Sequence, residues 1–130
     1  MPCTLDKLDK EWSLKFKSMT VKDSADNFKN PAKELRITLE FTKDVAEVKP
    51  IRKAFESSFA FERTPAKDRP PHVLFYMFDE DNVAITKVPL TFPEGEITGK
   101  SGDAFRAVVR VHPETFKKVK KIEIRMSEKE

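Results

Sequence analysis

Hydrophobic and polar residues alternate along much of this chain, which is the pattern of β-strands with one buried face. The clearest run spans residues 34–42, where every second residue is apolar and the residues between carry charges or hydroxyls. The apolar positions are Leu35, Ile37, Leu39 and Phe41. A period of two places one side of a strand against a core and the other side in water. Residues 104–111 and 120–126 alternate in the same way, so we predict strands there too.

Two further segments predict strands with special features. In residues 12–21 the apolar positions change phase at Ser18, which indicates a bulge or a strand that changes sheets. Residues 72–78 are apolar on both faces, which is typical of a central strand covered on both sides. A tight turn at residues 79–82 and a returning strand at residues 83–90 complete a predicted hairpin.

The middle of the chain is less regular. Apolar residues in 43–55 have helical spacing, but Pro50 interrupts them, so a short strand and a single helical turn both remain open. Residues 55–61 alternate again and predict a strand. His112 and Pro113 indicate the start of a short helical turn, because proline suits the first helical position.

Glycine and proline separate these runs. All three glycines (Gly95, Gly99 and Gly102) fall between the returning hairpin strand and the strand at 104–111. Both residue types punctuate β structure. We therefore predict one domain over residues 12–126, a seven-stranded antiparallel immunoglobulin-like β-sandwich. Residues 1–11 and 127–130 are predicted to be flexible ends.

Composition supports a single self-sufficient core. The chain has 130 residues and eleven phenylalanines, against one Trp and one Tyr. Phenylalanine has no polar atom to satisfy, so most of these rings are expected inside. The single cysteine, Cys3, excludes an internal disulfide. No run approaches the roughly 20 apolar residues of a membrane span, so no transmembrane segment is predicted. Nor does a signal sequence begin the chain, which leaves a cytoplasmic protein and an exported one with its leader removed as alternatives.

Charge is nearly balanced, with 25 basic and 22 acidic residues and a net charge of +3. Nucleic acid is not an expected partner, because basic and acidic residues alternate instead of forming a basic stripe with stacking aromatics. The densest basic cluster is Lys117, Lys118, Lys120 and Lys121. Such a cluster is a candidate binding site for an acidic partner, a polyanion or anionic lipid. Its simpler interpretation is a group of solvated lysines.

A second candidate is acidic. Asp79, Asp81 and Asp44 are weak candidates for calcium ligands, as in C2 domains that dock on membranes. Calcium takes 6–8 oxygen ligands, and too few carboxylates are expected here, so no metal or cofactor is predicted. If successive strands are antiparallel, the segments 43–54, 79–82 and 112–119 would share one end of the sandwich.

The sequence offers little for catalysis. Its two histidines, His72 and His112, each adjoin a proline and are far apart in the chain. A hydrolase that pairs one of them with Ser57, Ser58 or Ser101 is a third hypothesis. No nucleophile-elbow motif supports it. We therefore expect a protein that is not an enzyme.

The segment Phe75–Asp79 resembles the F-x-L-Y-D signature of a small prokaryotic β-sandwich domain, with Met77 for Leu and Phe78 for Tyr. The residues 80–84 resemble the turn and second hairpin strand of that family, and residues 99–105 resemble its later glycine-containing turn. The resemblance implies an immunoglobulin- or fibronectin-like module of bacterial surface or secreted proteins, without known catalytic activity.

Together these patterns predict a non-catalytic protein-interaction or accessory module that binds a protein partner or itself through a sheet face or edge strand. The alternative is a C2-like domain that binds calcium or makes peripheral contact with anionic lipid.

Overall fold

In the computed structural model of this protein, residues 1–59 and 70–127 are described. The chain is mostly β, with eight strands and three helices in these residues. In chain order the elements are β1 (Cys3–Leu5), α1 (Leu8–Glu11), β2 (Leu14–Ala25), β3 (Pro31–Phe41), α2 (Lys49–Phe59), β4 (Val73–Phe78), β5 (Ala84–Val88), β6 (Phe92–Glu94), β7 (Ala104–Val111), α3 (Pro113–Lys118) and β8 (Lys121–Met126).

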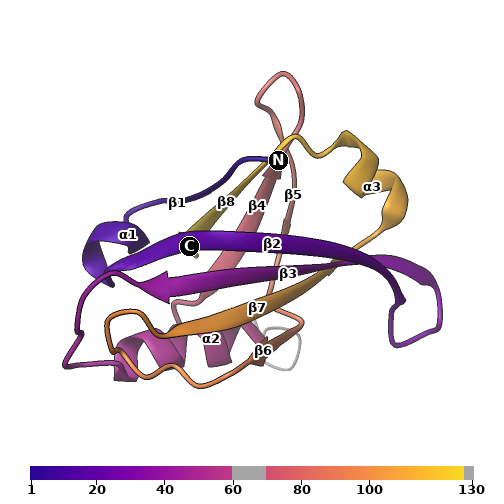
Figure 1. The fold of residues 1–130 in the computed structure, drawn as a ribbon. Helices are drawn as coiled ribbons and strands as arrows, with labels where there is room; N and C mark the ends of the chain where they lie inside the picture. Colours follow the sequence, from indigo (N-terminus) through magenta and orange to yellow (C-terminus); the bar gives the residue numbers. More distant parts are fainter. Residues whose placement is uncertain (60–69, 128–130) are drawn as a thin grey trace.

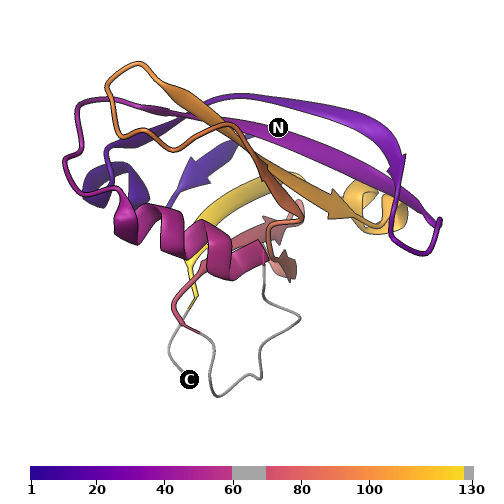
Figure 2. The same ribbon diagram turned by 90° about the horizontal axis from the view of Figure 1, so that it is seen from below.

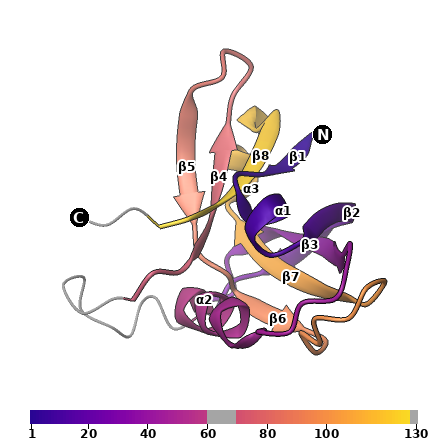
Figure 3. The ribbon, with the colours of Figure 1, turned by 90° about the vertical axis from the view of Figure 1, so that its left-hand side faces the viewer.

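The strands form two four-stranded sheets, with the orders β1-β8-β4-β5 and β2-β3-β7-β6 (Figure 1). Neighbouring strands are antiparallel except β1 and β8, which are parallel. Figure 3 shows the two sheets side by side, with α1 joining β1 to β2. Helix α2 contacts β4 of one sheet and β6 of the other, and Figure 2 shows it lying across the strands. The predicted two-sheet β architecture is confirmed at this level, with eight strands where seven were predicted.

Several strand predictions are confirmed in detail. The pairing of β2 with β3 shifts register between Phe16 and Ser18, so the phase change in the sequence is a β-bulge. Strand β7 has the predicted bounds, and β4 and β5 form the predicted hairpin. The short helix α3 begins at Pro113, and its N-cap His112 accepts a hydrogen bond from the backbone N–H of Glu114 through Nδ1 at 3.1 Å.

The strand predicted at residues 55–61 is wrong up to Phe59, because α2 extends from Lys49 to Phe59. The residues that α2 buries are spaced by three and four positions, as on one helix face. These are Ile51, Ala54, Phe55 and Ser58. Pro50 lies in the first turn, where its missing N–H costs no intrahelical hydrogen bond. The rest of the predicted strand, 60–61, lies outside the described residues.

The first eleven residues, predicted to be flexible, form β1 and α1. Cys3 pairs with Ile122 of β8, and the side chain of Leu8 is 1% exposed in the core. This stretch is mostly polar, with four apolar residues at Met1, Cys3, Leu5 and Leu8, and so predicted neither element. The place of β1 and α1 beside β8 and β2 follows from the tertiary structure alone.

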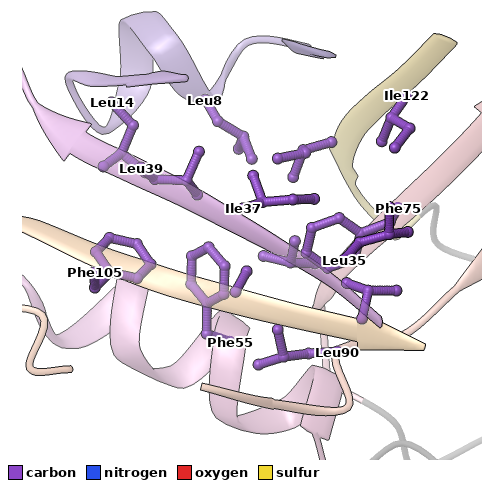
Figure 4. Packing of buried hydrophobic residues seen from close by; sticks show 14 of the residues in the cluster. Leu8, Leu14, Leu35, Ile37, Leu39, Phe55, Phe75, Leu90, Phe105 and Ile122 are labelled. Atoms are coloured by element: carbon purple, nitrogen blue, oxygen red, sulfur yellow. The ribbon is translucent and has the colours of Figure 1, made fainter. Parts of the chain in front are cut away.

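The core lies between the two sheets and α2 (Figure 4). Strand β3 contributes the alternating residues that the sequence predicted, and they are almost fully buried. Phe55 of α2 packs edge-on against Phe105 of β7, with ring centroids 5.1 Å apart. Phe105 also lies 6.0 Å from the ring of Phe41. Burial of these large apolar surfaces is the main favourable contribution to folding.

Candidate functional site

The four lysines of the predicted basic cluster lie at the junction between α3 and β8. Lys117 and Lys118 end α3, where their charges face the negative end of the helix dipole. Lys117 also pairs with Glu114, with Nζ and Oε1 3.1 Å apart. Lys120 is exposed, whereas Lys121 is half-buried and begins β8. The cluster therefore spans the end of α3, the connection at Lys120 and the start of β8.

The turn at residues 79–82 lies beside this cluster. The backbone N–H of Lys120 donates to the carbonyl of Phe78 at 2.8 Å, directly before the turn. The predicted neighbourhood of residues 79–82 and 112–119 is thus present. The third segment of that prediction, 43–54, lies elsewhere, and this part of the prediction is wrong. Because β3 and β7 are antiparallel neighbours, the end of β3 meets the start of β7, at the opposite end of the sheet from α3.

The candidate calcium ligands serve local structure. The carboxylate of Asp79 accepts hydrogen bonds from the N–H groups of Asp81 and Val83, both at 2.9 Å, and so closes its own turn. Asp44 accepts from the N–H of Ser101 at 2.9 Å, in the loop that follows β3. Within residues 1–59 and 70–127, no three His, Cys, Asp or Glu side chains gather in a way that could hold a metal ion.

The outer face of the β1-β8-β4-β5 sheet carries stacked aromatic and cationic side chains. The guanidinium of Arg125 on β8 lies 4.6 Å from the ring centre of Tyr76 and 5.5 Å from that of Phe78. The ammonium of Lys121 lies 5.2 Å from the Phe78 ring. Glu123, between the two cations on β8, pairs with both, at 2.5 Å to Arg125 and 3.6 Å to Lys121. We call these five residues the aromatic–cation layer.

This layer explains how β4 can be apolar on both faces. Its inner residues face the core, and its outer residues Leu74 and Phe78 are only 5% and 7% exposed. Arg125 is the cross-strand partner of Leu74, and Lys121 is the partner of Phe78. The aliphatic stems of long cationic side chains cover apolar surface while their charges stay in water. Strand β4 is thus covered on both sides as predicted, on its outer side by the side chains of β8.

The sequence identified Lys121 but missed Tyr76 and Arg125 as members of one site. Their signal was present in two places: aromatic residues at alternate positions of β4, and charged residues at alternate positions of β8. Only the pairing register brings the two rows together.

The histidines occupy separate structural positions. The Nδ1 atom of His72 lies 2.9 Å from the carbonyl oxygen of Pro70, and the backbone of His72 bonds to Ser127. His112 caps α3. The hydroxyls of Ser58 and Ser101 interact with the backbone groups of Leu90 and Thr42.

A comparison with protein families, curated proteins and solved structures found no match to this chain. None of the helices in the described residues is long and apolar enough to cross a membrane.

Proposed function

We propose that this protein is a non-catalytic binding module whose protein partner docks on the aromatic–cation layer and the adjoining lysine cluster. The observation that carries this proposal is the stacking of the Arg125 guanidinium on the outer face of its sheet, 4.6 Å from the ring centre of Tyr76. Tyrosine and arginine are, with tryptophan, the residue types enriched at binding hot spots. Glu123 holds the guanidinium in place, which lowers the entropy lost on binding.

Charge indicates what kind of partner this face would bind. Lys117, Lys118 and Lys120 are exposed beside the layer, and Lys87 is exposed on β5 opposite Tyr76. An acidic protein surface with an apolar centre would complement this arrangement, because matched charges speed association and fix orientation.

The same proposal includes an immunoglobulin-like relation, which strand order supports. In immunoglobulin constant domains one sheet has the order A-B-E-D, and the other contains C next to F. If β2, β3, β4, β6, β7 and β8 are matched in chain order to strands A to F, the sheet β2-β3-β7-β6 has the order A-B-E-D. In the other sheet β4 lies next to β8, as C lies next to F. The parallel strand β1 lies beside β8, where an immunoglobulin domain has strand G. Helix α2 and this parallel strand are departures from that pattern. The proposed relation to bacterial F-x-L-Y-D domains depends on the hairpin motif.

Site-specific photo-crosslinking tests the binding proposal. A benzophenone amino acid replaces Lys87, which is exposed on the face in question, and the variant is irradiated in extract of the source cells. A matched control places the same group at Lys53, exposed on α2. We expect a discrete protein adduct from position 87 that disappears when Arg125 is replaced by alanine. The same adduct from position 53, or none from position 87, would contradict the proposal.

A further inference from the structure

The outer face of the β2-β3-β7-β6 sheet carries an arrangement of charges that the function proposed above does not use. Six basic side chains from three neighbouring strands take part in ion pairs there, and we call them the cationic face. They are Lys15, Lys17, Lys22, Arg36, Arg106 and Arg110. Three carboxylates, from Glu34, Glu40 and Glu94, lie among them.

Each carboxylate is shared between at least two of these cations. Glu34 lies 3.2 Å from Lys22, 3.1 Å from Arg36 and 3.3 Å from Arg110. The other two pair in the same way, Glu40 with Lys15 and Lys17, and Glu94 with Arg36 and Arg106. These six cations and three carboxylates together carry a charge of +3. Asp26, directly after β2, adds a carboxylate near Arg110: hydrogen bonds from Asn30 and Phe28 and the charge of Arg110 lower its pKa.

The cations and carboxylates differ in exposure. The side chain of Glu34 is 2% exposed and that of Glu40 is 16% exposed, whereas Lys15, Lys17 and Lys22 are more than half exposed. Arg106 is also 54% exposed. Glu34 and Glu40 therefore lie beneath the lysines that pair with them, whereas Glu94 is 31% exposed, more than Arg36 and Arg110. The four most exposed charged side chains of the face are nevertheless cations, namely Lys15, Lys17, Lys22 and Arg106, so a partner approaching this face meets mainly positive charge.

Two arginines keep donors available for a ligand. Arg110 donates to Glu34 through Nε, and its guanidinium carbon lies 5.7 Å from the ring centre of Phe92. The two terminal nitrogens of this guanidinium are therefore the donors that a ligand could reach. The nearest contact of Arg106 to Glu94 is 3.7 Å, beyond a hydrogen bond. Such forks bind carboxylates through two parallel hydrogen bonds.

We propose that the cationic face binds an extended acidic segment of a partner protein. Arg106 and Arg110 lie on the same side of β7, and at about 3.3 Å per residue their backbones are roughly 13 Å apart. Acidic residues four positions apart on an extended chain have the same spacing. Single-stranded nucleic acid fits less well, because it needs open rings for base stacking, and Phe92 is half-buried with the guanidinium of Arg110 close to its ring.

This surface and the aromatic–cation layer are the outer faces of different sheets. A module with both would hold two protein segments on opposite sides. The two surfaces share no residue, so a variant on one of them tests that surface alone.

Fluorescence anisotropy with a labelled synthetic peptide of alternating glutamate and serine tests the inference. The variant Lys17→Glu/Arg106→Glu reverses two exposed charges on the face. The control Lys53→Glu/Lys100→Glu makes the same change in net charge at exposed positions elsewhere. We expect the face variant to weaken peptide binding by about tenfold or more and the control by less than about twofold. Circular dichroism verifies that both variants fold.

Three outcomes would overturn the inference. The first is an equal loss of peptide affinity in both variants, which would mean that only net charge matters. The second is tighter binding of an oligothymidine strand, and the third is tighter binding of phosphatidylserine vesicles, each measured at the same ionic strength. None of these outcomes bears on crosslinking from position 87.

Discussion

The hydroxyl of Ser58 accepts a hydrogen bond from the backbone N–H of Leu90 at 2.8 Å, inside the core. The two residues are 0% and 2% exposed, and they belong to α2 and to the connection between β5 and β6. A buried N–H without a partner is costly, so this bond favours the position of α2 against the strand connection.

Replacing Ser58 by alanine removes the acceptor and leaves the N–H of Leu90 buried without its partner. We expect the free energy of unfolding to fall by about 1–3 kcal/mol. Ser57→Ala, at the neighbouring half-buried position, is the matched control, and its effect should stay within about 0.5 kcal/mol. Urea denaturation measures both. Equal destabilisation by the two variants would show that the bond does not hold the helix.

Glu34 makes the stability of the fold depend on pH. Burial alone would raise the pKa of its carboxyl group, but hydrogen bonds from Lys22, Arg36 and Arg110 outweigh burial and hold the pKa below its ordinary value. A carboxyl with a lowered pKa stabilises the fold above its unfolded pKa of about 4.3, and this contribution is lost as pH falls through the folded value.

We therefore expect the melting temperature of the wild type to fall more steeply below about pH 5 than that of Glu34→Gln. The glutamine variant should be less stable at pH 7, because three basic side chains lose their charged partner. Thermal melts from pH 3 to pH 7 compare the slopes. Parallel curves would mean that Glu34 does not set the acid sensitivity.

Gly99 and Gly102 both have left-handed backbone conformations but differ in their surroundings, so alanine variants of the two separate backbone strain from steric clash. Gly99 has φ of 78°, and a Cβ there would lie 2.3 Å from Val48 Cγ1 and 2.6 Å from the carbonyl oxygen of Val45. Gly102 has φ of 87° but no atom within 4 Å of such a Cβ. Gly102→Ala should cost about 1–2 kcal/mol from backbone strain alone.

Gly99→Ala should destabilise the protein by more than Gly102→Ala, because it adds a clash with the loop before α2 to the same strain. Chemical denaturation of the two variants measures the difference. Equal costs would indicate that the loop at Val45 and Val48 moves aside without penalty.

The thiol of Cys3 is predicted to be inert in the folded protein. Burial raises its pKa to about 12, so the reactive thiolate is scarce at pH 8. We expect slow reaction with a disulfide reagent in buffer and fast reaction in urea. The double variant Cys3→Ala/Thr4→Cys moves the thiol to the exposed neighbour and should react quickly when folded. Fast reaction of the native wild type would show that β1 does not stay paired with β8.

The strands and their faces could be predicted from the sequence at residues 34–42 and 104–111, where alternation is long, but not at residues 55–61. Leu35, Ile37 and Leu39 are fully buried as expected, because a period of two fixes which side of a strand meets the core. The phase change at Ser18 likewise located the bulge. The helix α2 could not be predicted, because Phe55 fits both a two-residue and a helical period, and burial against Phe105 decides between them.

The candidate site was only partly accessible to the sequence. The lysine cluster could be found by counting charges, whereas the stacking of Arg125 on Tyr76 depends on the antiparallel register of β4 and β8. The cationic face likewise combines residues of β2, β3 and β7.

The sequence by itself determined that this chain folds mainly as strands, where β2, β3, β4, β5, β7 and β8 lie, and which of their sides are apolar. The reason is that residue spacing and steric preference act over a few neighbouring positions. Tertiary structure decided which strands pair, that α2 is a helix, that β1 lies against β8, and which charges meet on each outer face. These depend on contacts between residues distant in the chain, such as Glu34 and Arg110, whose partners no local pattern specifies.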